Sequence, residues 1–457
     1  MQLRIISTPM LCFLGLAGVL LLSLNGCGGL SPDANFEAKK AGSRAFEHVL
    51  VIYQENRTPD NLFHGLPHAD IASSGVNSLG KRIVLQPITL ANHYDLGHEH
   101  TDFLAMYDKG KMDGADKIAC ASGCPHNPQF KYVDPSEVAP YFQLARQYTF
   151  GDRMFQTNQG PSFPAHQFII SGTSAPTATS HLFAAENTQH SNGTTGCAAP
   201  PTAWVLLIDP SGKESSKMYP CFEHPTLMDL LNHAGIAWKY YTPLAGWGWT
   251  GPNAIKHICA PVDEHCAGSD WTNHVILHNT QVLSDISEGT LPAVSWVIPT
   301  GQASDHAKVN NGSGPAWVAS IVNAVGHSRY WATTAIIITW DDWGGWYDHV
   351  APPQVRVNCS EWGCGYIYGF RVPLIVVSPF AKAGYVSHVR HHTGSILKFI
   401  EKTFGLPTLG YADAIADDLS DCFDLKQDPI PFQTISAPLD AAYFLNDRST
   451  PLDPDDD

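Results

Sequence analysis

The chain has 457 residues and a formal net charge of −16 with histidine neutral, and no basic run interrupts this acidity. The charge argues against nucleic acid as a partner and against electrostatic docking on anionic lipid. An anionic substrate would need locally positive groups, which a bound cation can supply. The length is sufficient for a large core, built as one α/β domain or as two domains.

Residues 1–27 have the features of a bacterial export signal. One positive residue precedes an apolar stretch, and Leu24-Asn25-Gly26-Cys27 follows it. Leu-x-Gly-Cys resembles the lipobox, which implies that Cys27 carries a lipid that anchors the mature protein to a membrane. Asn25 is unusual at its position, so plain secretion stays open. The predicted location is therefore the cell envelope, on the periplasmic or outer-membrane face, or outside the cell.

The remaining chain is predicted to consist of a tether, one large domain and an extension. Residues 28–45 are small and polar, which is typical of a tether. From residue 46 to residue 425, helix and strand signals alternate, and this alternation indicates a layered α/β fold. Residues 426–457 are rich in proline and aspartate, and they are interpreted as a C-terminal extension that ends in an exposed acidic tail.

Two β-branched runs, 48–53 and 333–340, predict strands that are buried on both faces, as in a mainly parallel sheet. Ligands bind beyond the carboxyl ends of such strands. The polar residues at these ends are Glu55 and Asn56 after the first run and Asp341 and Asp342 after the second. Three carboxylates and an amide oxygen are a suitable donor set for a hard divalent cation. The alternative is that each pair only caps a helix or forms a turn.

Further elements continue the alternation of helices and strands. Helices are predicted at 141–146 and 226–234, and strands at 236–241, 293–298 and 372–377. Stretches rich in glycine and proline, at 185–225 and 243–270, are interpreted as loop excursions from the core.

Ser162 is predicted to lie at or just before the N-terminus of a helix. The apolar stripe after Pro164 has a helical period, and proline is tolerated in a first helical turn. Backbone N–H groups at that end favour an anion, and a hydroxyl deprotonated beside a metal can attack phosphorus. The alternative role is an ordinary N-cap. The flanking residues do not form the G-x-S-x-G elbow of α/β-hydrolases.

Histidine and lysine side chains complete the set of candidates. His306 follows the predicted strand 293–298, where an imidazole can bind a phosphate oxygen or protonate a leaving group. His98, in Gly97-His98-Glu99-His100, is a second candidate for this role. Lys111 is a possible phosphate contact in the substrate-binding site, with a solvated loop lysine as the alternative. Asp348 and His349 are predicted to orient the aspartates.

Nine cysteines follow Cys27, and eight of them form couples of short spacing. These couples are Cys120 with Cys124, Cys197 with Cys221, Cys259 with Cys266, and Cys359 with Cys364. Sequence alone does not fix this connectivity, but an exported chain makes disulfides the expected use, and Cys422 is then left over. A zinc site at Cys120, Cys124 and His126 is the alternative, although it lacks a second close pair.

The motifs around these residues resemble, in this order along the chain, a known bacterial family. They are Gln54-Glu55-Asn56-Arg57, Gly160-Pro161-Ser162-x-Pro-x-His166, Ser304-Asp305-His306 and Asp341-Asp342-Trp343-Gly344-Gly345-x-x-Asp348-His349. The chain is similar here to the phosphoesterase family that unites certain acid phosphatases with non-zinc-type phospholipases C. The resemblance extends over roughly residues 46–425, and several motifs in register make it specific.

The resemblance implies an alkaline-phosphatase-like α/β fold, with a central and mostly parallel sheet between helices. It also implies a site that holds one or two divalent metal ions. Their ligands would be Glu55, Asn56, Asp341, Asp342 and Ser162. Ser162 would also be the nucleophile, and His306, together with His98, would act at the phosphate or the leaving group.

The expected function is metal-dependent hydrolysis of phosphate esters through a phosphoserine intermediate. Phospholipase C members commonly have threonine at the nucleophile and Asp-Glu at the acidic pair, so Ser162 and Asp341-Asp342 favour an acid-phosphatase-like enzyme. One alternative is a phospholipase C that acts on phosphocholine lipids. Another, from a different class, is an inactive surface-binding lipoprotein.

Overall fold

The computed structural model describes residues 45–451, and a nine-stranded sheet forms the centre of this part. The strand order is β13-β10-β14-β1-β15-β16-β6-β17, and β18 pairs with β6. The strands are β1 (His48–Gln54), β6 (Thr149–Phe155), β10 (Trp238–Tyr241), β13 (Val275–Ile276), β14 (Val294–Val297), β15 (Thr334–Trp340), β16 (Arg371–Val377), β17 (Tyr385–Ser387) and β18 (His391–His392).

The sheet is mostly parallel, as the apolar runs predict. β14 and β15 both pair with β1 in parallel. Within the described part of this central sheet only β16 runs antiparallel to its two neighbours, β15 and β6. Every residue of β15 and β16 is buried, which explains why these segments are continuous apolar runs rather than alternating ones.

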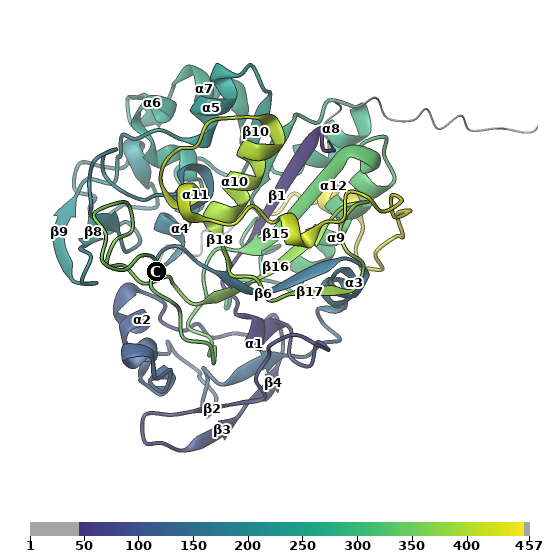
Figure 1. Cartoon of the computed structure of the whole chain (residues 1–457). Helices are drawn as coiled ribbons and strands as arrows, with labels where there is room; N and C mark the ends of the chain where they lie inside the picture. The colour runs from purple at the N-terminus through teal and green to yellow at the C-terminus, as the bar shows by residue number, and fades with distance from the viewer. Residues whose placement is uncertain (1–44, 452–457) are drawn as a thin grey trace, which may run out of the picture. The chain divides into compact units, whose positions relative to one another are not determined.

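Two groups of helices pack on the sheet, which lies between them (Figure 1). One group contains α4 (Ser162–Ser171), α5 (Leu227–His233), α10 (Thr393–Phe404) and α11 (Ala412–Ile415). The other contains α3 (Ala139–Gln147), α8 (Gln281–Glu288), α9 (Gly314–Gly326) and α12 (Ala441–Asn446). The predicted layered α/β fold is therefore confirmed.

Shorter elements lie outside these layers. The remaining helices are α1 (Pro59–Leu62), α2 (His100–Tyr107), α6 (Lys256–Cys259) and α7 (Ser269–His274). Four small sheets are formed by β2 (Ser74–Val76) with β3 (Arg82–Val84), β4 (Gln86–Ile88) with β5 (Lys131–Val133), β7 (Phe183–Ala184) with β8 (Val205–Ile208) and β9 (Glu214–Met218), and β11 (Pro261–Val262) with β12 (His265–Cys266).

A second apolar cluster attaches the segment around α2 to the central layers. Trp343 and Trp346, which follow the aspartate pair at the end of β15, are buried beside Leu96 and Phe103. The buried indole rings therefore place the chain that carries His98 against the loop after β15. This packing cannot be read from either segment alone.

The C-terminal extension packs on the domain up to α12. Ile435 and Phe444 are buried, and the ring of Phe444 lies 5.2 Å from that of Trp317 on α9. The acidic end at 452–457 lies outside the described residues, and so does the predicted signal with Cys27. None of the helices within 45–451 has the length and the apolar run needed to cross a bilayer.

The four predicted disulfides are present in the structure. They join Cys120 to Cys124, Cys197 to Cys221, Cys259 to Cys266 and Cys359 to Cys364. The zinc alternative at Cys120, Cys124 and His126 is therefore wrong, because both sulfur atoms are consumed in a disulfide. Cys422 is a buried free thiol.

Candidate active site

The two acidic junctions meet at one edge of the sheet because β1 and β15 are parallel neighbours. Gln54 lies opposite Trp340 in the register, and the next backbone N–H, that of Asp341, donates to the Gln54 carbonyl at 3.0 Å. In turn, the backbone N–H of Asn56 donates to Asp341 Oδ1 at 3.0 Å. The strand pairing itself therefore places Glu55 and Asn56 beside the two aspartates.

The backbone at this edge adopts conformations that suit only particular residues. Asn56 has φ +60°, a left-handed conformation that asparagine tolerates better than most residues. Gly344 has φ +61°, and a Cβ at this glycine would lie 2.6 Å from the Asn56 carbonyl oxygen. The turn after the aspartates can therefore approach Asn56 closely only because residue 344 has no side chain.

Ser162 is the first residue of α4, and all ten residues of this helix are buried. Its side chain does not cap the helix, since Pro161 is at the N-cap position. Instead, Ser162 Oγ lies 3.4 Å from Glu55 Oε2 and 3.5 Å from Asp342 Oδ2. The hydroxyl thus faces the carboxylates, as a nucleophile or metal ligand would, and the N-cap alternative does not describe its position.

His166 is a member of the site to which the sequence assigned no role. It lies one helical turn after Ser162, and its Nε2 is 3.0 Å from Glu55 Oε1, with both side chains fully buried. Burial lowers the pKa of His166 to about 4, so the neutral imidazole donates a hydrogen bond to the carboxylate. The signal that could have identified it is the i, i+4 spacing from Ser162, which puts both residues on one helix face.

Two further histidines approach Asn56 from the other side. The side-chain amide of Asn56 lies between two sets of groups: one of its atoms is 3.1 Å from Asp341 Oδ1 and 3.2 Å from Glu55 Oε2, and the other is 3.1 and 3.2 Å from the Nε2 atoms of His98 and His306. Each imidazole is oriented through Nδ1, which lies 2.8 Å from a backbone carbonyl. Burial lowers the pKa of His306. Asn56 therefore joins the carboxylates to the imidazoles.

The donor set fits a divalent cation. Glu55, His166 and Asp341 each offer a ligand atom within 4.8 Å of the others, and all three are buried. Asp341 Oδ2 is buried without a hydrogen-bond partner, and burial, followed by the charge of Asp341, raises the pKa of Asp342. A cation would satisfy the unpaired oxygen and relieve the repulsion between the carboxylates.

Lys111 is the one predicted site residue that the structure does not bring to this group. Its side chain is 63% exposed and forms an ion pair of 2.7 Å with Asp108 in the loop after α2. The solvated-loop alternative describes this position.

Asp348 and His349 anchor the loop that follows the aspartates. Asp348 accepts hydrogen bonds from Arg371 on β16, and His349 Nδ1 lies 2.8 Å from Asp60 on α1. Since α1 follows Glu55 and Asn56 along the chain, these contacts connect the segments that leave both acidic junctions. Their effect on the carboxylates is therefore indirect, through the backbone.

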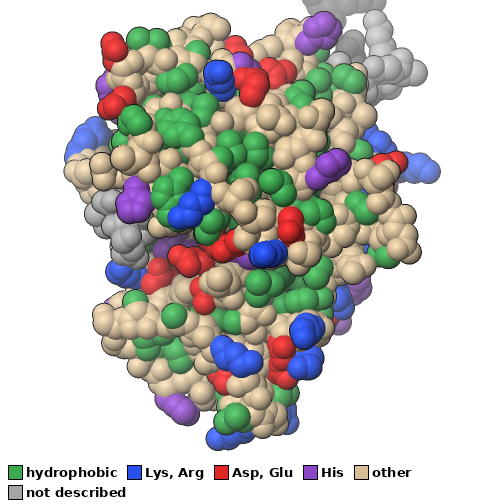
Figure 2. Space-filling model, turned by 90° about the vertical axis from the view of Figure 1, so that its left-hand side faces the viewer, with side chains coloured by type: hydrophobic (Ala, Val, Ile, Leu, Met, Phe, Trp, Pro, Cys, Tyr) green, Lys and Arg blue, Asp and Glu red, His purple; other side chains and the backbone are tan. Residues whose placement is uncertain are grey.

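A pocket of about 620 Å³ opens beside His98 and His306. One wall contains the segments 95–99 and 119–121 and the other contains 187–193, and Pro161, just before Ser162, also lines the pocket. Figure 2 shows a hollow with gathered acidic side chains across the face that carries α2 and β9. The pocket has the size of a small-molecule site.

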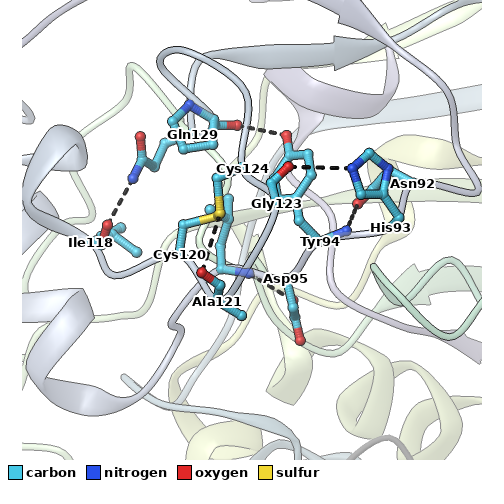
Figure 3. The surroundings of a disulfide bond; sticks show 12 residues. Asn92, His93, Tyr94, Asp95, Ile118, Cys120, Ala121, Gly123, Cys124 and Gln129 are labelled. Atoms are coloured by element: carbon cyan, nitrogen blue, oxygen red, sulfur yellow. Dashed lines mark hydrogen bonds between the residues drawn. A yellow bond between two sulfur atoms is a disulfide. The ribbon is translucent and has the colours of Figure 1, made fainter.

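The disulfide between Cys120 and Cys124 closes the loop that forms part of the first wall (Figure 3). Backbone hydrogen bonds of 3.2 Å from Ala121 to Asp95 and of 2.9 Å from Gly97 to Ala119 pair this loop with the segment that carries His98. The disulfide thus restrains the backbone that positions His98.

Comparison with known proteins gives a family and several distant relatives. The model of the phosphoesterase family matches residues 46–407. The chain is 24% identical over 425 residues to the non-hemolytic phospholipase C of Burkholderia pseudomallei, covering 79% of this chain and 55% of that protein. It is 23% identical over 483 residues to the hemolytic phospholipase C of Pseudomonas aeruginosa, covering 90% of this chain and 60% of that protein.

The chain thus spans little more than half the length of these two relatives. Among solved structures, a protein of the alkaline phosphatase superfamily from Vibrio parahaemolyticus matches with a TM-score of 0.37 and 11% identity, covering 83% of this chain and 70% of that chain.

Proposed function

Because the chain belongs to the phosphoesterase family, we propose that it hydrolyses phosphate esters with Ser162 as the nucleophile. The observation that carries this proposal is the position of Ser162 Oγ, 3.4 Å from Glu55 Oε2 and 3.5 Å from Asp342 Oδ2. A buried hydroxyl at the start of a helix, turned towards carboxylates rather than towards the helix backbone, is poised for metal-assisted attack on an anionic ester.

The residues that would hold one or two divalent ions are Glu55, Asn56, Asp341, Asp342 and the Ser162 hydroxyl. A bound cation would neutralise the phosphate and lower the pKa of that hydroxyl. His166 positions Glu55 through its hydrogen bond of 3.0 Å. The side-chain amide of Asn56 lies 3.1 Å from Asp341 Oδ1 and 3.2 Å from Glu55 Oε2, so its oxygen would join these carboxylates in holding a cation.

The reaction that this arrangement supports has two displacements. Ser162 Oγ forms a bond to phosphorus while the bond from phosphorus to the leaving oxygen breaks, and this yields phosphoserine. A bound phosphate anion favours the charged imidazole, so with substrate present His306, assisted by His98, would protonate the leaving oxygen, because both imidazoles line the pocket on the far side of Asn56 from the carboxylates. Attack of water on phosphoserine then releases phosphate and restores the serine.

We propose an acid-phosphatase-like monoesterase as the preferred activity. Ser162 and the Asp341-Asp342 pair support this choice over the threonine and Asp-Glu of common phospholipase C members. The second candidate is a phospholipase C, which is favoured by the names of the relatives at 23% and 24% identity. Turnover of an aryl phosphate monoester against intact phosphatidylcholine separates the two.

Replacement of Ser162 tests the proposal. Ser162→Ala should abolish turnover of an aryl phosphate monoester. It should also abolish labelling of the protein by phosphate from that substrate. The melting temperature of the variant in the presence of metal should be unchanged. Ser162→Thr is the matched variant, because it keeps a hydroxyl, and it should retain measurable turnover. Full activity of Ser162→Ala would show that another group attacks phosphorus.

We also propose that the domain works outside the cytoplasm, anchored through Cys27. The four disulfides support an oxidising compartment. Metabolic labelling with a radioactive fatty acid should mark the wild-type protein and not Cys27→Ala. Equal labelling of both proteins would disprove the anchor.

A further inference from the structure

We propose that the pocket beside His98 and His306 binds the leaving group, and that it selects small leaving groups that bear hydroxyls and carry no negative charge. This inference rests on the proposed hydrolysis at Ser162 and adds the substrate class. The leaving oxygen must depart near the imidazoles that protonate it, and these line the pocket together with Pro161, the residue before the nucleophile.

The first argument is the polarity of the walls. The segment 187–193 contributes a series of amide, hydroxyl and imidazole side chains, namely Asn187, Thr188, Gln189, His190, Ser191 and Asn192. Within residues 45–451 the lining has one large aliphatic side chain, that of Leu96, and it is almost fully buried. The rings of the lining are the imidazoles of His98, His190 and His306, and no phenylalanine, tyrosine or tryptophan stands among the described lining residues. Acyl chains or a stacked ring would therefore find little apolar surface here.

The second argument is charge. Three carboxylates line the pocket, those of Asp95, Glu99 and Asp102, and the lining contains no lysine or arginine within the described residues. Like charges in a partly desolvated pocket repel each other more strongly than in bulk water. A leaving group that carries further phosphates is therefore disfavoured, whereas hydroxyl groups can donate to the carboxylate and amide oxygens.

The third argument is that both walls are held in place. Gln189 and Trp204 exchange backbone hydrogen bonds of 2.8 and 3.1 Å, and Asn187 Oδ1 accepts from the backbone N–H of Phe163 in the first turn of α4 at 3.0 Å. The opposite wall is closed by the disulfide between Cys120 and Cys124. A restrained polar pocket of about 620 Å³ suits a small polyol better than a lipid with two chains.

Steady-state kinetics of the purified, metal-loaded protein test the inference with four esters. These are phenyl phosphate, glycerol 1-phosphate, ATP and dihexanoyl phosphatidic acid. Glycerol 1-phosphate should have a kcat/KM at least about 10-fold above those of ATP and the phosphatidic acid, because the pocket repels the anionic group and gives no apolar cover to the acyl chains. ATP has the better leaving group chemically, so this order would report the pocket rather than intrinsic reactivity.

Charge variants of Glu99 test whether the discrimination against ATP arises in the pocket. Glu99→Lys should raise the ratio of kcat/KM for ATP to that for glycerol 1-phosphate by about 10-fold. Glu99→Gln, which is less disruptive at the start of α2, should raise the ratio by about 3-fold. The matched control is Glu288→Lys, an exposed residue on α8 that does not line the pocket, and it should leave the ratio unchanged.

The outcomes distinguish this inference from the function on which it rests. If phenyl phosphate is turned over, and kcat/KM for ATP or for the phosphatidic acid equals or exceeds kcat/KM for glycerol 1-phosphate, the leaving-group assignment is overturned. The phosphoesterase proposal is then left intact. A ratio that does not respond to either Glu99 variant would overturn the leaving-group assignment as well. No turnover of any of the four esters would overturn both.

Discussion

The Nε2 atom of His166 lies 3.0 Å from Oε1 of Glu55, and neither side chain reaches solvent. Glu55 follows β1 and His166 lies on α4, so this contact connects the acidic edge of the sheet to the helix that carries Ser162. The other oxygen of the Glu55 carboxylate, Oε2, lies 3.4 Å from Ser162 Oγ. Glu55 therefore has one oxygen towards the nucleophile and one towards the residue that orients it.

His166→Ala should weaken metal binding rather than abolish the chemistry. Loss of a partner that orients a metal ligand typically lowers metal affinity by about 10- to 100-fold. The measurement is kcat of the chelated protein as divalent metal is added back. The metal concentration that gives half-maximal kcat should be higher for His166→Ala than for wild type by the same factor. His166→Gln, which keeps a donor, should shift the curve less. An unchanged metal dependence in His166→Ala would disprove the positioning role.

Asp341→Asn should stabilise the metal-free protein while it removes activity. The variant keeps the oxygen that accepts from the Asn56 N–H but removes a buried charge beside Asp342. We expect the free energy of unfolding of the chelated protein to rise by on the order of 1 kcal/mol. Added metal should raise the melting temperature of wild type and not of the variant. Asp424→Asn, at an exposed position, is the control, and it should behave as wild type in both states.

Asn56→Gly and Asn56→Ala should separate the side chain from the backbone. Both variants remove the amide that joins the carboxylates to the histidines, so both should lose most of the activity. Only alanine is strained at φ +60°, so Asn56→Ala should unfold with a free energy about 1 kcal/mol lower than Asn56→Gly. Urea denaturation measures this difference. Equal stability of the two variants would contradict the left-handed conformation at residue 56.

Removal of the disulfide at Cys120 should affect turnover as well as stability. For a loop this short, the chain-entropy model predicts a loss of about 2 kcal/mol. Because the loop pairs with the segment that carries His98, we expect kcat/KM to fall in the Cys120→Ser/Cys124→Ser double variant. The control is Cys359→Ser/Cys364→Ser, whose bridge has a similar sequence separation but does not line the pocket. It should lose stability and keep kcat/KM, and an equal loss of kcat/KM in both double variants would contradict the role of the first loop.

The stability of the protein should fall as pH rises through the titration of His349. Burial opposes the charge on this imidazole, but its hydrogen bond to Asp60 and the charges of Asp60 and Asp348 outweigh burial and raise its pKa to about 9. Between the ordinary value near 6.5 and about 9, the folded state binds more protons than the unfolded state. The stabilisation is therefore complete below the ordinary value and is lost above about 9.

Urea midpoints measured across this pH range should show the decline for wild type. In His349→Gln the dependence on pH should be flatter, since the titrating group is absent. The same slope in both proteins would assign the pH dependence to other groups.

The elements that lead to the site could be predicted from local sequence. Runs of buried β-branched residues specify β1 and β15 whatever surrounds them, and the polar residues that follow must then lie at a carboxyl edge. Likewise, the helical period after Pro164 specifies α4 and puts Ser162 at its start. Spacing along the chain suggested the four cysteine couples without fixing their connectivity, and the structure confirms them.

The tertiary structure alone decided which distant groups meet. The position of His98 depends on the packing of Trp343 and Trp346 against the segment around α2, and no local pattern encodes a contact between residues so far apart. β16 pairs antiparallel with both β15 and β6, and its apolar run by itself does not reveal this direction. Lys111 is exposed and pairs with Asp108 instead of reaching the site.

His166 shows the difference most clearly. Its place on the same helix face as Ser162 follows from the sequence, since residues four apart align in an α-helix. Its role does not, because the hydrogen bond to Glu55 exists only when α4 packs across the end of β1. Periodicity and chain connectivity act over a few residues and can be read from sequence. The distances that allow chemistry arise from the packing of whole elements, to which the entire core contributes.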